Sequence, residues 1–284
     1  MKTLKTAFLL TALTLLLLLA GQAIAGQRGM TIALVFAVLM NGTAYFFSDK
    51  IALMSSGAQP ISREQAPRLY AVMERLAAKA NLPMPKLYMI PQPAPNAFAT
   101  GRNPSHASVA VTQGLMQLLD DEELEGVIAH ELSHVRNYDI LTSSIAATIA
   151  GAITWIASMG RWAMIFGGWG GRDNDREGGG IAALLMLILA PIAALLLQLG
   201  ISRQREYQAD ASGAKMVGHP YGLVRALEKL GAYNKRIPMD ISPSTSALCI
   251  VAPLSTRQFL TGLFSTHPPL ADRIAKLQAM TITR

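Results

Sequence analysis

The amino-acid sequence predicts a mainly α-helical membrane protein, with about four transmembrane helices and a polar α+β domain that contains a small sheet. Three observations lead to this fold class. The 284-residue chain is 51% hydrophobic and only 15% charged, whereas soluble domains carry about 25% charged residues. Its apolar residues gather in four long runs. The polar segments outside these runs show helix and strand patterns.

Each of the four uncharged runs is long enough to cross a bilayer, since a helix needs about 20 apolar residues to do so. The runs are 6–27, 29–48, 140–160 and 178–202. The third run continues past Arg161 and is rich in small residues, which suit close helix packing in a membrane. A re-entrant or interfacial helix is the alternative for this run.

The first run also has features of a cleaved signal peptide. Lys2 and Lys5 precede it, and Ala23-Ile24-Ala25 resembles a cleavage site. However, the apolar stretch is long, and the second run follows after only Gln27-Arg28-Gly29. We therefore favour a retained helical hairpin. The predicted domains are a transmembrane hairpin at 1–50, a polar part at 51–139, a second hydrophobic hairpin at 140–202 and another polar part at 203–284.

The distribution of Lys and Arg predicts the orientation, because cytoplasmic flanks carry an excess of these residues. Six of them flank the runs on one side and three on the other: Lys2, Lys5, Lys50, Arg136, Arg203 and Arg205 against Arg28, Arg172 and Arg176. We expect the N-terminus and both polar parts to lie in the cytoplasm.

The net charge of +7 does not by itself indicate nucleic acid. The chain has no Lys/Arg-rich run and no zinc-finger spacing, so we expect no nucleic-acid partner. Cys249 is the single cysteine of the sequence, which excludes an intrachain disulfide framework and a thiolate metal cluster.

The polar parts are predicted to hold helices around a small sheet. A capping box from Ser62 to Gln65 begins a helix over 63–81, and Asp120 or Asp121 caps another that ends near Asn137. The other predicted elements are strands at 86–90, 96–101 and 108–112 and helices at 203–217, 221–230 and 268–280.

The strongest chemical signal is His130-Glu131-Leu132-Ser133-His134. Residues four apart lie on the same side of a helix, so both imidazoles can reach one metal ion. Glu131 points slightly aside, where its carboxylate can act as a catalytic base. This is the arrangement of zinc proteases. The alternative is that two histidines meet by chance on an amphipathic helix.

Two histidines do not complete a catalytic zinc site, which needs three protein ligands. Glu206 and Asp210 are also four residues apart on a predicted helix. Glu206 can be the third ligand, and Asp210 can accept a hydrogen bond from a ligand histidine. The alternative is a solvated helix face with Arg–Glu pairs. Two hydrophobic runs separate Glu206 from the histidines, so an even number of crossings returns the chain to the same side, and the metal should lie near the membrane surface.

The combined pattern resembles a known membrane protease family. The residues that carry the resemblance are His130 to His134, a hydrophobic hairpin, Arg205-Glu206-Tyr207-Gln208-Ala209-Asp210, and Thr266-His267-Pro268-Pro269 with Arg273. In this combination, over nearly the whole chain, they resemble the HtpX heat-shock proteases, which are related to the CAAX prenyl proteases.

The resemblance implies a multi-pass protein of the bacterial inner membrane with a cytoplasmic, zincin-like protease domain and one Zn²⁺ per chain. It also implies stress-related quality control of membrane proteins, with membrane-protein substrates, the lipid bilayer as surroundings, and self-cleavage. The segment from Asn96 to Gly101 resembles a substrate-binding edge strand of that family, which makes Asn96, Ala97 and Phe98 candidate substrate-binding residues.

His267 and Arg273 are candidates for stabilising an oxyanion, since they lie about one helical turn apart and can face the metal. Capping and packing are their alternative role. For the whole chain, the alternatives to a protease of broad specificity are a catalytically inactive membrane adaptor, a metal transporter and a prenyl-peptide protease. The intact Glu131 argues against the adaptor, and the scarcity of ionisable residues in the runs argues against the transporter.

Overall fold

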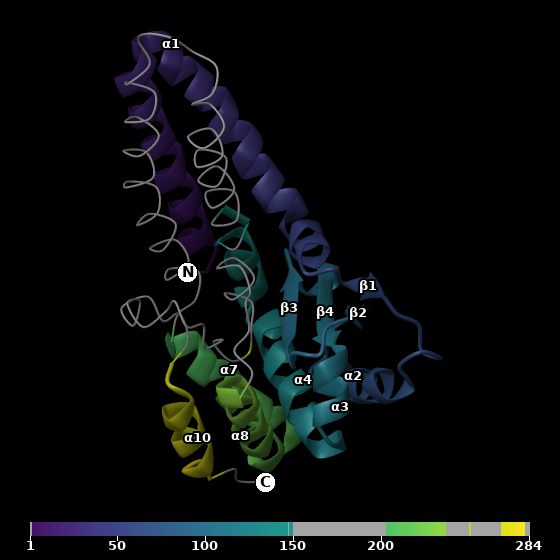
Figure 1. Ribbon diagram of the computed structural model, residues 1–284. Coiled ribbons are helices and arrows are strands. Elements are labelled where there is room, and N and C mark those ends of the chain that lie inside the picture. The colour runs from purple at the N-terminus through teal and green to yellow at the C-terminus, as the bar shows by residue number, and fades with distance from the viewer. Residues whose placement is uncertain (1, 147, 150–202, 237–249, 251–267, 282–284) are drawn as a thin grey trace.

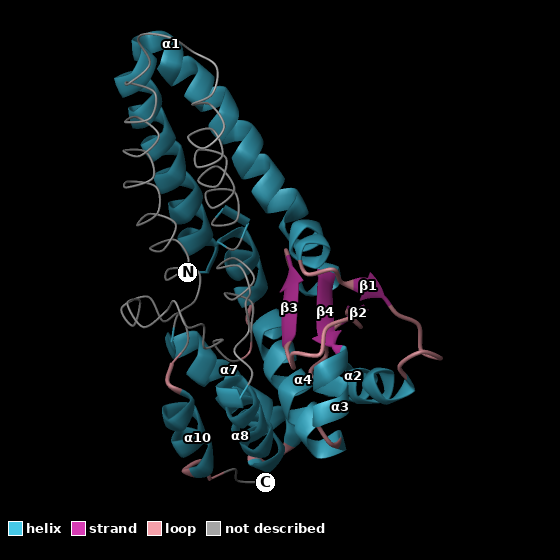
Figure 2. Cartoon of the chain, in the orientation of Figure 1, coloured by secondary structure: helices cyan, strands magenta, loops and turns pink. Residues whose placement is uncertain are grey.

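The computed structural model describes residues 2–146, 148–149, 203–236, 250 and 268–281. A long helical element, α1 (Lys2–Ser55), forms one end of the molecule. A four-stranded sheet and the remaining helices gather at the other end (Figure 1). The described part is thus mainly helical with one small sheet beside the lower end of α1 (Figure 2).

The element α1 folds back on itself at Gly26, whose φ of +59° is a conformation that glycine adopts at little cost. The Asn41 side-chain amide donates to the Thr14 hydroxyl at 2.8 Å. In a straight helix, 27 residues would separate these groups by about 40 Å. Gly21 and Ala33, on opposite sides of the bend, also lie in close contact. The element α1 therefore consists of two antiparallel arms.

The second arm of α1, Gly26–Ser55, is long and apolar enough to cross a membrane. Ile32, Val38, Leu39 and Phe46 are largely exposed on it. It is the one helix of that kind within the described residues. The prediction of about four transmembrane helices is therefore not confirmed, and residues 150–202, which hold the fourth run and part of the third, lie outside the described part. The predicted domain boundaries stay a prediction.

The start of the third hydrophobic run packs against α1. Residues 139–146 and 148–149 are helical, and Ile145 and Ile149 form a buried cluster with Ala44. Leu10 and Leu17 of the first arm lie against the same cluster. Both arms of α1 therefore contact the helix that follows the polar part.

The sheet has the order β1-β2-β4-β3, with β1 (Gln59–Pro60), β2 (Lys86–Ile90), β3 (Ala97–Gly101) and β4 (Ala107–Thr112). β2 and β4 are parallel, and the other pairs are antiparallel. The three predicted strands are confirmed to within one residue at each end. The predicted turn after Gly101 contains a short helix, η1 (Pro104–His106). β3 is an edge strand, as expected.

Helix α4 (Asp121–Arg136) lies at the centre of the polar part. It contacts α2 (Pro67–Lys79), α7 (Arg203–Val217), α8 (Tyr221–Arg236) and strand β3, while α10 (Leu270–Gln278) packs on α7 and α8. Leu124, Val127, Ile128 and Leu132 of α4 are fully buried in the main core. The helix that carries the metal motif is thus enclosed on several sides.

Three helices differ from the sequence prediction in their boundaries. The Ser62 N–H donates to the Gln65 side chain at 2.8 Å, but this pair closes a turn, and α2 begins only at Pro67. Proline lacks an N–H and disfavours helical geometry in the residue before it, here Ala66. α8 continues past the predicted end at residue 230, and α10 is shorter than 268–280. A further helix, α3 (Gln113–Leu118), which was not predicted, is capped by the Thr112 hydroxyl.

Glycines allow α4 to approach its neighbours closely. A Cβ at Gly126 would lie 2.8 Å from the Leu223 Cα atom of α8. A Cβ at Gly213 of α7 would lie 3.0 Å from the His130 backbone nitrogen. Real Cβ atoms do not pack this closely against backbone, so the helix spacing depends on the missing side chains.

Gly126→Ala should lower the free energy of unfolding by about 1–3 kcal/mol, because the added methyl group meets backbone that cannot move aside. The measurement is the thermal unfolding midpoint of the detergent-solubilised protein. Gly42→Ala is the matched control, since nothing lies within 4 Å of a Cβ added there. A midpoint for Gly126→Ala equal to that of the control would contradict the packing argument.

Candidate metal centre

Helix α4 carries the first residues of the site. Asp120 caps the helix by accepting from the Glu123 N–H at 2.9 Å, and the Glu123 carboxylate accepts from the Asp120 N–H at 2.9 Å. Both His130 and Glu131, at 1% and 4% exposure, are buried in the last turns of this helix. Their burial places polar groups where an isolated charge would be costly, so partners are required.

Helix α7 brings the partners from a distant part of the chain. His130, His134 and Glu206 each offer a ligand atom, and these atoms lie within 4.8 Å of one another. The two Nε2 atoms are 3.2 Å apart. The Glu206 carboxylate oxygens lie 3.4 Å from His134 Nε2 and 3.7 Å from His130 Nε2.

This triangle of groups can surround one metal ion. Zinc bonds of about 2.0–2.2 Å hold neighbouring ligand atoms about 3.3–3.6 Å apart, close to the distances of 3.2 and 3.4 Å that His134 Nε2 makes with His130 Nε2 and Glu206 Oε1. The 3.7 Å distance to His130 is made by the other Glu206 oxygen, Oε2. Two imidazoles and one carboxylate are also a ligand set of catalytic zinc sites, which leave one position open. The sequence-predicted ligands therefore come together in a geometry that suits zinc.

Asp210, four residues after Glu206 on α7, lies behind His130. Its Oδ1 atom is 2.8 Å from His130 Nδ1, the nitrogen that faces away from the other ligands. Arg273 of α10 donates to both Asp210 oxygens at 2.7 and 2.8 Å. Burial raises the pKa of Asp210, but Arg273 outweighs it and holds that pKa below the usual value. Asp210 is therefore anionic and suited to orient His130.

His134 has a partner that the sequence reasoning missed. Asp139 Oδ2 lies 3.5 Å from His134 Nδ1, and Asp139 Oδ1 lies 3.8 Å from Arg205 Nη1. The available signal was an acidic residue directly between the metal-motif helix and an apolar run. It was not decisive, because only the end of α4 determines where that side chain points.

Glu131 lies beside the ligands and contacts the sheet. Its Oε2 atom accepts a hydrogen bond from the Ala99 N–H of β3 at 2.8 Å. Burial raises the pKa of Glu131 to about 7, while the nearby His134 acts in the opposite direction. A carboxyl group with a pKa near neutrality can both take up and release a proton, which is what acid–base catalysis needs.

The two imidazoles differ electrostatically. Burial lowers the pKa of His130. Burial also disfavours the charged form of His134, but Asp139 and Glu206 outweigh it and raise the pKa of His134 to about 10. The concentration of carboxylates at this site thus favours a cation between them.

The predicted substrate and oxyanion residues have mixed positions. The Asn96 side chain accepts from the Ile250 N–H at 3.1 Å, Ala97 is in the main core, and Phe98 packs with Leu53 near the end of α1. The Arg273 guanidinium is 1% exposed and also donates to the Ile250 carbonyl at 2.7 Å. These contacts favour positioning roles for Asn96 and Arg273. His267 lies outside the described residues.

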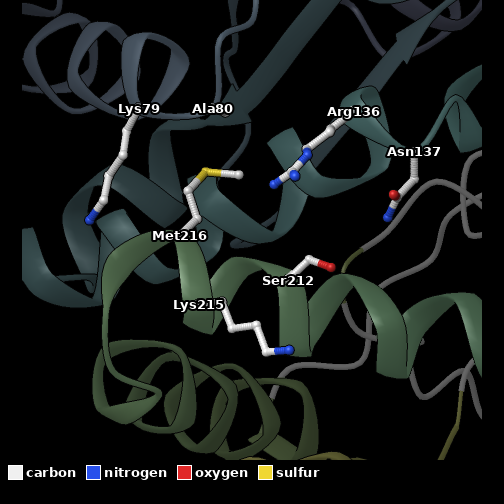
Figure 3. A pocket seen from close by; sticks show the side chains of 7 residues that line it. All are labelled: Lys79, Ala80, Arg136, Asn137, Ser212, Lys215 and Met216. Atoms are coloured by element: carbon white, nitrogen blue, oxygen red, sulfur yellow. The ribbon is translucent and has the colours of Figure 1, made fainter. Parts of the chain in front are cut away.

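A separate hollow of about 440 Å³ lies between α2, α4 and α7, lined by Lys79, Ala80, Arg136, Asn137, Ser212, Lys215 and Met216 (Figure 3). Its three cations stand in the last turns of the three helices, where they offset the negative end of each helix dipole. Lys79 also donates to the Val217 carbonyl at 3.2 Å. Their side chains do not converge on one point in Figure 3, so we assign this group a stabilising role.

Comparison with known proteins decides the family. The model of peptidase family M48 matches residues 62–281, which include both helices of the metal centre. The chain belongs to peptidase family M48. This M48 chain is 58% identical over 273 residues to a "Protease HtpX homolog" of Desulfatibacillum aliphaticivorans, covering 96% of the chain and 88% of the relative. It is 49% identical over 284 residues to the homologue of Pelotomaculum thermopropionicum, with 99% and 100% coverage. The M48 chain is therefore a metallopeptidase of the HtpX type.

A solved structure shares the fold of the M48 chain. The crystal structure of S. mikatae Ste24p superposes with a TM-score of 0.53 at 22% sequence identity. The match covers 97% of this chain but spans only 64% of the length of Ste24p. At this identity the likeness establishes the fold alone.

Arg273→Lys should lower metal affinity by about tenfold, because lysine lacks the planar fork with which Arg273 donates from two nitrogens to the two Asp210 oxygens, and Asp210 is then held less firmly against His130. The measurement is competition for zinc with a chromophoric chelator. Arg225→Lys is the control, since Arg225 pairs with Glu122 on a half-exposed surface at 2.7 Å. Equal zinc affinity in both variants would show that Arg273 does not act through Asp210.

Zinc affinity should fall as the pH is lowered, because the raised pKa of His134 keeps a proton on that imidazole in the metal-free protein. Zinc binds only the neutral ring and must displace the proton. One displaced proton predicts a loss of about tenfold per pH unit between about pH 8 and pH 6. His106→Gln should leave this slope unchanged, since His106 is exposed and contacts Asn103. An affinity independent of pH would contradict the prediction.

Proposed function

We propose that this chain is a membrane-embedded zinc endopeptidase that cleaves misfolded or damaged membrane proteins on the cytoplasmic side of the bacterial inner membrane. One observation carries the catalytic part of the proposal. Three ligand atoms that lie within 4.8 Å of one another stand beside the buried Glu131, whose carboxylate accepts from the Ala99 N–H. A purely structural metal site has no need of this additional carboxylate.

His130, His134 and Glu206 would hold the zinc ion, which would supply a Lewis acid and would lower the pKa of water to about 7. Glu131 is the group that takes up the proton of the attacking water and later delivers it to the leaving amine. Its pKa of about 7 suits both steps. Asp210 and Asp139 hold the ligand imidazoles from behind, so the residues that bind the metal need not reorganise during the reaction.

Strand β3 is the element that supports a peptide substrate. It pairs with β4 along one edge only among the described strands. Its Ala99 N–H points from the other edge toward Glu131. An extended peptide aligned with β3 would be recognised through backbone groups, a mode that tolerates many sequences. Because Phe98 packs against α1, we assign recognition to the β3 backbone in place of the Phe98 side chain.

The position of the site supports membrane-protein substrates. Phe98 of β3 packs with Ala52 and Leu53 at the end of the apolar arm of α1. Asp139, beside His134, directly precedes the third apolar run. Both contacts support a metal centre next to segments that we assign to the membrane interface. The resemblance to the HtpX heat-shock proteases supports quality control under stress as the biological role, with self-cleavage as an accompanying activity.

Glu131→Gln should retain zinc and lose cleavage by at least about 100-fold, because the amide cannot accept the proton. The measurement is cleavage of a denatured membrane-protein reporter by the detergent-purified enzyme, together with its zinc content. Glu125→Gln is the control on the same helix, where Glu125 pairs with Arg75 at 2.9 Å. It should cleave like the parent.

Retained cleavage by Glu131→Gln would rule out Glu131 as the base. Zinc binding without cleavage by the parent enzyme would instead favour a membrane adaptor. Cleavage that persists after zinc is removed and its return is blocked by a chelator would refute the zinc-dependent mechanism.

A further inference from the structure

The two ends of the hydrophobic section meet at the metal centre. Asp139 stands directly before the third apolar run, and Arg205 follows soon after the fourth. Their side chains lie 3.8 Å apart and are largely buried. An ion pair removed from water in this way is retained only where its geometry is well supported. The pair therefore joins the points at which the chain leaves α4 and returns as α7.

Asp139 contacts the nitrogen of His134 that does not face the other metal ligands. Its Oδ2 atom is 3.5 Å from His134 Nδ1, while His134 Nε2 faces His130 and Glu206 at 3.2 and 3.4 Å. The arrangement repeats that of Asp210 on His130. A carboxylate on the far nitrogen fixes the tautomer and the ring orientation of a metal-binding histidine.

The backbone after α4 is shaped to bring Asp139 into this position. Asn137 ends the helix, and the Tyr138 N–H donates to the Val135 carbonyl at 3.0 Å. Tyr138 has a φ of +59° and is 54% exposed. A bulky residue rarely adopts this conformation, because its Cβ approaches the following carbonyl oxygen. The turn it makes returns the Asp139 side chain toward the last turn of α4.

Arg205 holds Asp139 from the opposite helix. It is the residue before Glu206, so neighbouring positions at the start of α7 supply a metal ligand and the cation that faces Asp139. Arg273 has the corresponding position behind Asp210. Each ligand histidine thus has an aspartate at Nδ1, and each aspartate has an arginine.

We propose that Asp139 is a positioning residue for His134 and that Arg205 holds Asp139 in place, so that the geometry of the metal centre depends on the two ends of the hydrophobic section staying together. This inference rests on the proposed metallopeptidase site and extends it. It assigns a role to a residue outside the metal motif, at the junction of the protease part with the hydrophobic section.

The test is the zinc affinity of the purified full chain, measured by chelator competition, with activity as a second readout. Asp139→Ala should weaken zinc binding by about 10- to 100-fold. Asp139→Glu should restore part of this loss. Arg205→Gln should weaken zinc binding by about tenfold. The double variant, Asp139→Ala with Arg205→Gln, should bind zinc no more weakly than Asp139→Ala alone, because Arg205 acts through Asp139.

Glu123→Gln is the matched control for lost stability. Glu123 is a buried carboxylate at the other end of α4, paired with Lys229 at 2.6 Å. Its replacement should lower the unfolding midpoint but leave zinc affinity unchanged. If Asp139→Ala does not fold, Arg205→Gln and Asp139→Glu decide the question.

The inference would be overturned if every Asp139 and Arg205 variant bound zinc within about threefold of the parent affinity. Replacing a residue that holds a metal ligand normally weakens metal binding by more than this. If the parent in that case still binds zinc and cleaves the reporter, the proposed function stands and only the role of Asp139 is lost. A parent that does not bind zinc would overturn both. Additive losses in the double variant would refute the path from Arg205 through Asp139.

Discussion

The contact between α4 and α7 is the constraint on which the metal centre depends. His130 and His134 come from one helix and Glu206 from another, more than seventy positions later in the sequence. Their ligand atoms must nevertheless lie within a few ångströms of one another. Gly213 allows the α7 backbone to reach the backbone of His130, because a Cβ there would lie only 3.0 Å from the His130 nitrogen. A larger residue would separate the helices and open the ligand triangle.

The same contact concentrates buried charge. Glu131, Glu206, Asp210 and Asp139 are all largely buried around the two histidines. Carboxylates removed from water are costly unless a cation and hydrogen bonds compensate. Arg273 compensates Asp210, and Arg205 lies beside Asp139. Asp139 and Glu206 outweigh the effect of burial and raise the pKa of His134, and the same concentration of carboxylates suits a divalent cation.

The fold places the charged metal centre beside an apolar part of the molecule. α1 ends beside β3, and the helix after Asp139 packs on both arms of α1. The edge strand, the base and the beginning of the hydrophobic section are therefore neighbours. The organisation agrees with membership of peptidase family M48 and with the fold shared with Ste24p.

The sequence by itself determined the elements and the residue types of the site. Local periodicity and capping predicted α4, α7 and the strands β2, β3 and β4 to within about a residue, since these depend on neighbours in the chain. The spacing of four residues predicted that His130 and His134 share one helix face and that Glu206 and Asp210 share another. It did not predict that α2 starts as late as Pro67, where the missing proline N–H outweighs the capping pair formed by Ser62 and Gln65.

Only the tertiary structure decided how distant residues serve one another. The role of Asp139 depends on the positive φ of Tyr138, which no pattern of hydrophobicity reveals. The sequence left open whether Arg273 faces the metal or serves packing; the packing of α10 brings its guanidinium to Asp210 and Ile250 and to 3.8 Å from Glu206. Asn96 likewise holds the Ile250 backbone. The physical reason is that side-chain periodicity fixes which face of a helix a residue occupies, whereas its partner depends on which distant backbone approaches that face.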